Sequence, residues 1–383
     1  MKICAIICEF NPFHNGHKYV IEQAKKLSGC DAVLCIMSGN FTQRGDMCIF
    51  DKYTRAKHAV LGGADCVIQL PAPFAVAPAE IFAKGAVKIL SSIPEVTTLA
   101  FGCESGTADD FLNSAKILIK ESELFKSVLN EKLTIGESYI KSYAAAFEAC
   151  GGANGLLSKP NNVLALEYTK AILRLNANIN ILPIKRIGAG YNDGELKDGL
   201  SSASAIRANI GNPNIKDNVP DFVYSDLKSA VDSREFYSRS RHSLFLTDAE
   251  QLKKVYGGGE GLENKLKSLE NEPFECIIEK ATSRRYSSSR IKRMLCANAL
   301  GLYQNDCEKF LSGNLYIKPL AIKKERADEL LSALSKSDFP IVTGIDTDKL
   351  AHTAKECFEK DTFEFRFYNS ITNSDKKDYM VII

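Results

Sequence analysis

Short apolar segments alternate with amphipathic helical segments through the first half of this chain. The apolar segments are rich in Ile, Val, Leu and Cys and lie at 2–10, 32–39, 66–71, 97–102 and 177–186. Strands that are separated by helices predict parallel pairing with right-handed crossovers, and continuous apolar strands are typical of a sheet covered on both faces. The sequence therefore predicts an α/β fold built on a doubly wound parallel sheet.

The helical segments between the predicted strands carry ordinary start and stop signals. The segment 16–29 ends at Gly29, and the segment 51–63 begins after Asp51, a favourable N-cap, and ends in glycines. Further helices are predicted at 78–93, 107–122, 136–150 and 161–175.

A change in composition near residue 211 suggests a domain boundary. A length of 383 residues predicts two domains or three. The segment 211–221 is rich in Pro, Gly and Asn, as linkers are. We therefore expect one domain at 1–210 and a smaller, mainly helical region at 211–383, in which 315–345 forms a small α/β appendage.

The charge balance and the cysteines restrict the class of protein. The net charge is only +2, so a nucleic-acid face would have to come from a local cluster. The 12 cysteines are scattered without a CxxC pair, which argues against a zinc finger, and several lie inside apolar strands as buried thiols do. Reduced thiols, with neither a signal peptide nor a run of about 18 apolar residues, predict a cytoplasmic protein that does not contact a membrane.

The loop NPFHNGH follows the first predicted strand directly. Ligands of doubly wound sheets bind outside the carboxyl ends of the strands, and this loop lies there. Gly16 allows a close backbone approach, and the start of the next helix offers free N–H groups that suit phosphate. His14 and His17 are three residues apart and therefore point to the same side. We expect them to donate to phosphate oxygens and to stabilise charge that develops at phosphorus.

Two other interpretations of the histidine pair are weighed against phosphate handling. The histidines can be caps exposed to solvent, or they can bind a metal, although no third ligand lies at a useful spacing. The strand–loop–helix context favours phosphate, and no metal site is assigned.

The HNGH motif after a first strand resembles the HxGH motif of the HIGH-type nucleotidyltransferase superfamily. Its members attack the α-phosphate of ATP and release pyrophosphate without an enzyme nucleophile. The second signature of the superfamily is an ISSTxxR-like segment after the last strand, and this chain has SSASAIR at 201–207. Serines here can cap a helix and donate to phosphate, and Arg207 can pair with phosphate. The chain carries Ala203 where Thr or Ser is common, which leaves the role of Ser204 open.

Longer stretches resemble the bacterial tRNA(Met) cytidine acetate ligase family. The resemblance is closest over the first 210 residues and includes MSGNFTQRGD (37–46), DKYTRAKHAVLGGAD (51–65), FGCES (101–105), KPNNVLALEYTKAI (159–172) and IKRIGAGYND (184–193). It implies a Rossmann-like nucleotidyltransferase domain that converts ATP and acetate into acetyl-adenylate and pyrophosphate. The acetyl group then passes to N4 of the wobble cytidine, position 34, of elongator tRNA(Met). Mg²⁺ is expected with ATP, held mainly by phosphates and water.

The resemblance implies an ATP site with His14 and His17 as the catalytic residues. Gly102 ends a strand where a side chain would block a ligand, although a plain turn glycine is the competing interpretation. One of the two asparagines after Pro160 is expected to be an N-cap and one to contact nucleotide, and Arg186 can reach phosphate or simply be a solvated cation. The expected site comprises Ile7, Cys8, Glu9, Phe10, Asn11, Pro12, Phe13, His14, Asn15, Gly16, His17, Lys18, Tyr19, Val20, Gly102, Asn161, Asn162, Arg186, Ser201, Ser202 and Arg207.

A basic segment at 280–293, KATSRRYSSSRIKR, contains no acid and has Tyr286 among its cations. Charge with an interleaved aromatic suits an RNA backbone and base stacking, whereas a helix facing water is the competing interpretation. The loop 39–46 can order over acetate or the tRNA base, or be a mobile surface loop. The expected RNA contacts are Lys52 and Arg55, which share a helix face, and Arg284, Arg285, Arg290, Lys292 and Arg293.

Two other functions share parts of this pattern. An adenylyltransferase acting on a small molecule would have the same two motifs, but it would not need about 170 further residues with a basic helix. An RNA-binding protein with a degenerate nucleotide domain would not need an intact His14, Gly16 and His17. We therefore expect the tRNA acetate ligase.

Overall fold

The computed structural model describes residues 1–186, 196, 199–344, 347 and 350–383. Part of the stretch 184–193, used above for the family resemblance, lies outside the described residues. Within them, a seven-stranded sheet has the order β5-β4-β1-β2-β3-β6-β7. Its strands are β1 (Ile3–Cys8), β2 (Ala32–Ser38), β3 (Cys66–Leu70), β4 (Val96–Cys103), β5 (Asn180–Lys185), β6 (Pro319–Ile322) and β7 (Val381–Ile382).

The first five strands are parallel to one another, as the strand–helix alternation predicted. The chain moves from β1 outward to β3 and then returns to the other side of β1 with β4 and β5. The order of strands therefore reverses between β1 and β4. The prediction of an α/β, doubly wound sheet is confirmed.

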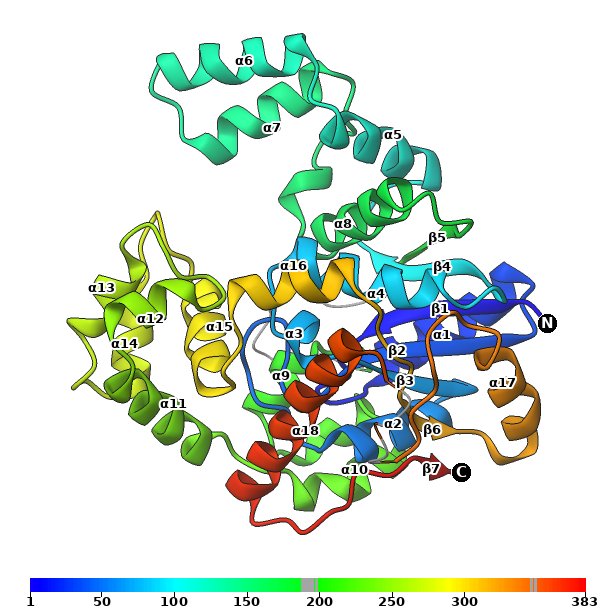
Figure 1. Ribbon diagram of the computed structural model, residues 1–383. Helices are drawn as coiled ribbons and strands as arrows, with labels where there is room; N and C mark the ends of the chain where they lie inside the picture. Colours follow the sequence, from blue (N-terminus) through cyan, green and yellow to red (C-terminus); the bar gives the residue numbers. More distant parts are fainter. Residues whose placement is uncertain (187–195, 197–198, 345–346, 348–349) are drawn as a thin grey trace.

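Helices cover both faces of the sheet (Figure 1). The first half of the chain contains α1 (Asn15–Ser28), α2 (Lys52–Leu61), α3 (Ala72–Ala75), α4 (Ala79–Ser91), α5 (Ala108–Ile119), α6 (Glu123–Thr134), α7 (Tyr139–Ala149), the 3₁₀ turn η1 (Leu156–Ser158) and α8 (Pro160–Arg174). The second half contains α9 (Ala203–Ala208), η2 (Pro213–Asp217), α10 (Asp221–Asp226), η3 (Leu227–Ser229), α11 (Arg234–Leu246), α12 (Ala249–Lys254), α13 (Leu262–Lys267), α14 (Phe274–Ala281), α15 (Ser288–Ala299), α16 (Gln304–Ser312), η4 (Lys324–Arg326), α17 (Ala327–Leu334) and α18 (His352–Thr372).

Local sequence explains where the site-bearing helices begin and end. Asp51 caps α2 by accepting from the backbone N–H groups of Tyr53 and Thr54, as predicted. Helix α1 ends at Ser28, and its C-cap, Gly29, has a φ of 63° that favours glycine. The helix α6 was not predicted, since its segment has a weaker apolar pattern than its neighbours.

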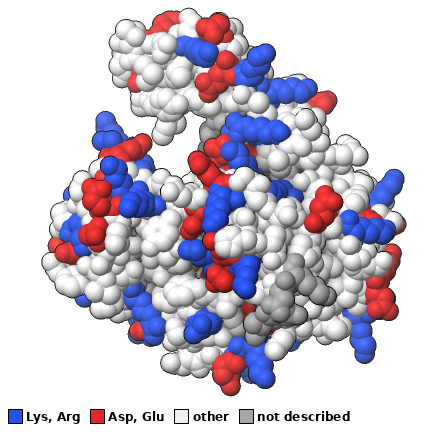
Figure 2. Space-filling view, in the orientation of Figure 1, with Lys and Arg blue, Asp and Glu red and all other residues white. Residues whose placement is uncertain are grey.

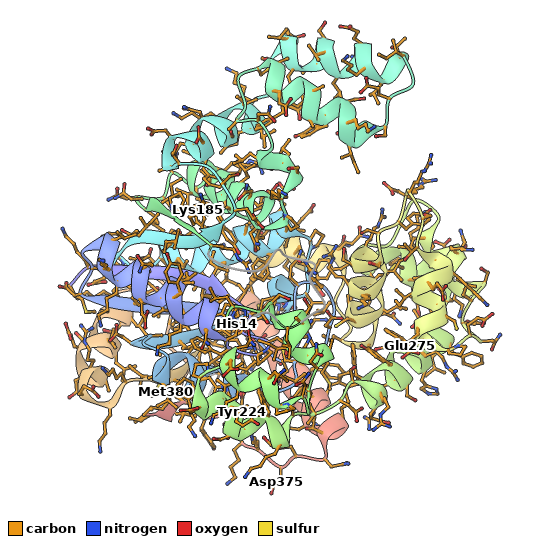
Figure 3. All side chains as sticks on the ribbon, turned by 180° about the vertical axis from the view of Figure 1, so that it is seen from behind. His14, Lys185, Tyr224, Glu275, Asp375 and Met380 are labelled. Carbon is orange, nitrogen blue, oxygen red and sulfur yellow. The ribbon has the colours of Figure 1, made fainter. Side chains whose placement is uncertain are left out.

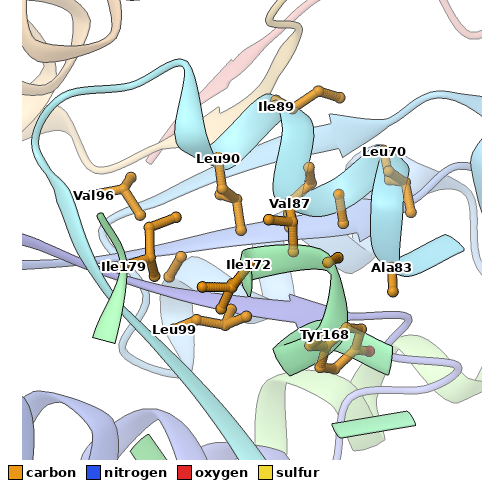
Figure 4. Close-up of a cluster of buried hydrophobic side chains, with 14 of the residues drawn as sticks. Leu70, Ala83, Val87, Ile89, Leu90, Val96, Leu99, Tyr168, Ile172 and Ile179 are labelled. Carbon is orange, nitrogen blue, oxygen red and sulfur yellow. The ribbon is translucent and has the colours of Figure 1, made fainter. Parts of the chain in front are cut away.

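Alternate residues of the central strands contribute their side chains to two separate hydrophobic cores. Ile3 and Ala5 of β1 belong to the core under α4 and α8, whereas Cys4 and Ile6 belong to the core under α1 and α2. This alternation follows from the two-residue period of a strand. Figure 4 shows the first core, where side chains of α4 and α8 such as Leu90 and Ile172 pack over the sheet.

The C-terminal part of the chain completes the N-terminal sheet. Strand β6 pairs antiparallel with β3, and β7 pairs with β6. The prediction that 315–345 forms a separate α/β appendage is therefore wrong, because its strand finds its partner in β3 rather than in a local neighbour. A further buried core is formed mainly by α11–α15, through residues such as Phe236, Leu252 and Ile291, and it also includes Phe41 and Tyr368. The boundary at residue 210 stays a prediction.

The helical hairpin of α6 and α7 projects from the body beyond α5 and α8 (Figure 1). None of the described helices is both long and apolar enough to cross a membrane.

Candidate functional site

Two adjoining cavities open at the carboxyl edge of the sheet, beside the end of β1. The first, of about 160 Å³, lies among β1, β4 and the first turns of α1. The second, of about 580 Å³, extends from the end of β1 toward α9 and α15. The first cavity occupies the point where the strand order reverses, which is where doubly wound sheets bind ligands. Figure 3 shows His14 at the centre of the molecule, between Lys185 at the end of β5 and Tyr224 of α10.

The two histidines of the HNGH motif line both cavities and stack on each other. Their ring centroids lie 3.6 Å apart. The Nδ1 atom of His14 accepts from the backbone N–H of Gly16 at 3.1 Å, and Nδ1 of His17 accepts from the backbone N–H of His14 at 3.3 Å. Because each Nδ1 is an acceptor, the proton of each neutral ring is on Nε2. Both histidines therefore offer an N–H donor.

Burial keeps both imidazoles neutral. It lowers the pKa of His14 to about 3, with a further contribution from the charge of Arg186. Burial, His14 and Arg186 together lower the pKa of His17 well below its ordinary value. Each neutral ring still has one N–H donor, at Nε2, that can bind a phosphate oxygen.

The first turn of α1 differs from the prediction in one respect. Its backbone N–H groups are not free, because Asn15 donates to the carbonyl of Asn218 at 3.1 Å and Gly16 donates to His14. The imidazoles, rather than the helix N–H groups, thus supply donors to the cavities. His14 is also the N-cap of α1, so capping and cavity lining are two roles of one side chain.

Gly16 makes room for the histidine stack. A Cβ atom at this position would lie 2.9 Å from Cε1 of His14 and 3.1 Å from its Nδ1. A side chain would therefore displace the His14 ring. The glycine of the HNGH motif is explained by this close approach.

Gly102, Asn161 and Arg186 form one side of the first cavity. A Cβ on Gly102 would lie 3.3 Å from Cγ of Arg186, so the glycine lets the arginine lie close to β4. Burial lowers the pKa of Arg186 from its ordinary value, although nearby Glu104 raises it. An arginine pKa remains far above neutrality, so the guanidinium is a positive charge beside the histidines.

The structure separates the roles of the two asparagines. Asn161 lines both cavities, and its Nδ2 donates to Glu104 Oε1 at 2.6 Å. Asn162 is buried and accepts from the backbone N–H of Glu104 at 2.9 Å, so it braces the loop after β4. Neither is the N-cap, because α8 begins at Pro160 with Lys159 before it. The expectation of an asparagine cap is wrong.

The SSASAIR segment lies against the same cavities. Ser201 lines the first cavity, whereas Ser202, Ser204 and Arg207 line the second. Ser202 caps α9 by accepting from the backbone N–H of Ala205 at 3.1 Å. Arg207 donates through Nη1 to the carbonyl of Asn11 at 2.6 Å, which ties this segment to the HNGH loop.

Four residues of the expected ATP loop do not line either cavity. Phe13 is in the core under α1 and α2, and the Asn15 side chain donates to the carbonyl of Asp217. Lys18 is 4.0 Å from Glu22 in an i,i+4 ion pair. Pro12 is the fourth of these residues. The loop residues that do line the cavities are Ile7, Cys8, Glu9, Phe10, Asn11, His14, Gly16, His17, Tyr19 and Val20.

Lys52 and Arg55 are not at the surface, and their expected contact with RNA is wrong. Each is 0% exposed. Arg55 donates to backbone carbonyls, including that of Phe50 at 3.1 Å. Lys52 is 2.7 Å from Asp378, near the C-terminus. These two buried cations therefore connect segments that are distant in sequence, including the C-terminal tail that carries Asp378.

The basic segment of α14 and α15 divides into three environments. Arg284 and Arg285 are exposed and, among the described residues, have no carboxylate at ion-pair distance. Arg290 pairs with Glu260 at 2.8 Å, and Lys292 pairs with Asp46 at 3.1 Å. Arg293 lines the second cavity and donates to the carbonyl of Gln43.

Several lining residues were missed in the sequence. Leu164 and Tyr168 line both cavities from α8. They follow Asn161 at helical spacing, so the period of α8 could have placed them on one face with it. The loop after β2 contributes Thr42, Gln43, Arg44 and Asp46 to the second cavity, and it is packed against α15, where Arg293 donates to the carbonyl of Gln43.

Comparison with known proteins agrees with the motifs. The model of the HIGH Nucleotidyl Transferase family matches residues 1–380. The tRNA(Met) cytidine acetate ligase of Acetivibrio thermocellus is 35% identical over 379 residues, covering 93% of this chain and 90% of the relative. The enzyme of the same name from Clostridium perfringens is 32% identical over 403 residues, covering 100% of this chain and 98% of the relative.

Two crystal structures of Thermotoga maritima TmcAL have the same fold. The apo form has a TM-score of 0.90 and 26% identity and covers 100% of both chains. The form bound with alpha-thio ATP has a TM-score of 0.88 and 27% identity, covering 100% of this chain and 99% of that one.

Proposed function

This chain belongs to the HIGH Nucleotidyl Transferase family, and we propose that it is an ATP-dependent tRNA acetate ligase that acetylates N4 of the wobble cytidine of elongator tRNA(Met). The relatives named tRNA(Met) cytidine acetate ligase match it over nearly its whole length. The observation that carries the proposal is the stacked pair of neutral histidines, each with an Nε2–H donor, at the edge of the sheet where a nucleotide binds.

In the first step, acetate is activated on ATP. A carboxylate oxygen of acetate attacks the α-phosphorus, and the bond between that phosphorus and the bridging oxygen of the β-phosphate breaks. The electron pair of that bond leaves with pyrophosphate, and acetyl-adenylate remains. His14, His17 and Arg186 stabilise the negative charge that develops on the phosphate oxygens. The protein needs no nucleophile of its own.

ATP enters with Mg²⁺ in this proposal. The acids that border the second cavity among the described residues are Glu9 and Asp46, and Asp46 is already paired with Lys292. Phosphate oxygens and water would therefore provide most of the ligands of the cation, which is the usual arrangement for Mg²⁺ with ATP.

In the second step, the acetyl group passes to tRNA. The second cavity joins the proposed ATP site to α15, and the exposed Arg284 and Arg285 lie just before that helix. Basic and acidic side chains are mixed over the face shown in Figure 2, so the RNA contact depends on such local groups rather than on a uniform field. Figure 2 also shows a hollow between the α6–α7 hairpin and the α12–α14 region.

We place the enzyme in the cytoplasm, where its tRNA substrate is. The cysteines of the chain are free, and most of them are buried, which is usual for a reducing compartment.

The test is nucleoside mass spectrometry on bacterial tRNA that lacks the modification, after incubation with the protein, ATP, Mg²⁺ and acetate. N4-acetylcytidine should form only when ATP and acetate are both present. If the protein binds ATP but forms no acetylcytidine, its acceptor is a different molecule and the proposal fails.

A further inference from the structure

The carboxylate of Glu9 has no role in the chemistry described so far. Glu9 follows β1 directly and lines both cavities, and no other acid among the described residues does so. We propose that Glu9 binds the exocyclic N4 amino group of the target cytosine and accepts the proton that this group loses when it is acetylated. This inference rests on the proposed function and assigns a residue to its second step.

The surroundings of Glu9 make it a poor ligand for ATP phosphates. Arg186, Arg207 and Arg293 line the same cavities and suit phosphate, whereas a carboxylate repels it. Glu9 itself forms no ion pair with any described residue. One oxygen, Oε1, accepts from the backbone N–H of Gln43 at 2.6 Å. The carboxylate therefore keeps capacity to accept further hydrogen bonds from a ligand.

The chemistry of cytosine matches such a group. Its N4 amino group is a donor of two hydrogen bonds, and Glu or Asp is the side chain that accepts from it. An enzyme that modifies a base takes the base out of the stack into a pocket, where it reads the Watson–Crick edge. The second cavity, with about 580 Å³ and the aromatic rings of Phe10 and Tyr168 in its wall, can hold a nucleoside.

The loop after β2 connects Glu9 to the basic helix α15. Gln43 accepts at its carbonyl from Nη1 of Arg293 at 2.9 Å, while its N–H holds Glu9. Lys292 pairs with Asp46 at 3.1 Å, and a Cβ on Gly45 would lie 2.5 Å from the carbonyl carbon of Lys292. The loop and the helix are therefore packed without space between them. Glu9 therefore has a fixed position relative to α15, and hence relative to any RNA that binds to this helix.

The electrostatics of Glu9 suit a proton acceptor. Burial raises the pKa of Glu9, and the hydrogen bond from Gln43 and the charge of Arg44 oppose that rise. An ionised carboxylate with a raised pKa is a stronger base than an ordinary glutamate.

The step balances as follows. The N4 nitrogen attacks the carbonyl carbon of acetyl-adenylate and forms the C–N bond. The bond between that carbon and the phosphate oxygen breaks, and its electron pair leaves with AMP. The proton of N4 passes to Glu9, which later releases it to water.

The variant Glu9→Gln separates the two steps of the reaction. Acetate-dependent exchange of pyrophosphate into ATP reports the first step, and single-turnover transfer to tRNA reports the second. Because Glu9 also lines the first cavity, exchange can fall as well, but transfer should fall by about 10²-fold more than exchange does. Transfer by the wild type should fall as pH drops through the pKa of Glu9, and the variant should lack this dependence.

Two further variants complete the test. Glu95→Gln changes a buried glutamate that precedes β4, at the opposite edge of the sheet, and both steps should stay at wild-type rates. Glu9→Asp keeps a carboxylate but shortens it, so exchange should persist and transfer should be reduced less than in Glu9→Gln; it also serves if Glu9→Gln does not fold.

The outcomes are distinct. A loss of exchange as large as the loss of transfer, in both Glu9 variants, would place Glu9 on ATP or its Mg²⁺ and overturn the inference. Unchanged transfer in Glu9→Gln would overturn it as well. A wild type with acetate-dependent exchange but no transfer to tRNA would instead contradict the proposed function.

Discussion

His14 stacks on His17 with 3.6 Å between ring centroids and an angle of 27° between the ring planes. Each ring is oriented by a backbone N–H that donates to its Nδ1. The hydrogen bonds that cap α1 therefore also set the tautomer of the two rings. Helix capping and phosphate binding are coupled in this motif, and they can be separated by substitution.

His14→Asn should remove catalysis and preserve the helix cap. Asparagine is as good an N-cap as any residue, so the melting temperature should stay close to that of wild type. The variant lacks the Nε2–H donor, and acetate-dependent pyrophosphate exchange should fall by about 10²-fold or more. Affinity for tRNA, measured by filter binding, should not change. His352→Asn, at an exposed histidine of α18, is the control. Wild-type exchange in His14→Asn would show that His14 only caps the helix.

Gly16→Ala should lower activity without unfolding the protein. The new Cβ would lie 2.9 Å from His14 Cε1, so the ring must move away from its position in the stack. Alanine favours a helix over glycine by about 1 kcal/mol, which offsets part of the clash. The exchange rate should fall at least tenfold at saturating ATP, with little change in the melting temperature. An exchange rate equal to that of wild type would mean that the stack is not needed.

Arg284→Ala combined with Arg285→Ala should weaken binding of tRNA. Both side chains are exposed, so their removal should not perturb the core. Each lost phosphate contact lowers the slope of log affinity against log salt by about 0.7 to 0.9. Binding titrations at several salt concentrations would measure this change. Lys324→Ala, at an exposed lysine that follows β6, should leave both affinity and slope unchanged. The same behaviour in the double variant would move the RNA site elsewhere.

Asp378→Asn should destabilise the fold. Asp378 pairs with two buried lysines, Lys52 at 2.7 Å and Lys318. Removing the shared carboxylate leaves their charges uncompensated, at a cost of about 3 kcal/mol. Urea denaturation of Asp378→Asn should show this loss, and Asp375→Asn, an exposed acid of the same tail, should not.

The contribution of Asp378 to the free energy of unfolding should depend on pH. Burial opposes its ionisation, but Lys52 and Lys318 hold its pKa below the ordinary value in the folded protein. A carboxyl with a depressed pKa stabilises the fold above its unfolded pKa of about 4 and loses that contribution as pH falls further. The difference in stability between wild type and Asp378→Asn should therefore shrink below about pH 4. A constant difference would show that the ion pairs do not stabilise the fold.

Much of the nucleotide site could be predicted from the sequence. The strand that ends at Cys8, the helix that begins at Asn15 and the histidines between them are adjacent in the chain. Their arrangement depends on local periodicity and capping, which a sequence displays directly. The different roles of Asn161 and Asn162 could not be predicted, because they depend on the hydrogen bonds that each asparagine forms with Glu104, which lies on another segment.

The basic residues show the limit of the same reasoning. Lys52 and Arg55 have the helical spacing of a surface pair, yet both are buried against segments that include the C-terminal tail. Arg293 belongs to a basic run, yet it lines the second cavity while Arg284 and Arg285 face solvent. Spacing along a helix assigns residues to a face but does not say what that face packs against.

By itself, the sequence determined the alternation of strands and helices in the first half of the chain and the HNGH loop that follows the first strand. Hydrophobic periodicity and helix caps involve only a few neighbouring residues, so these features can be predicted from short stretches of sequence. Only the tertiary structure decided that β6 joins β3, that Asp378 neutralises two buried lysines, and that Glu9, Gln43 and Arg293 meet at one cavity. These contacts join residues hundreds of positions apart or on separate elements, and the packing of the whole chain selects them.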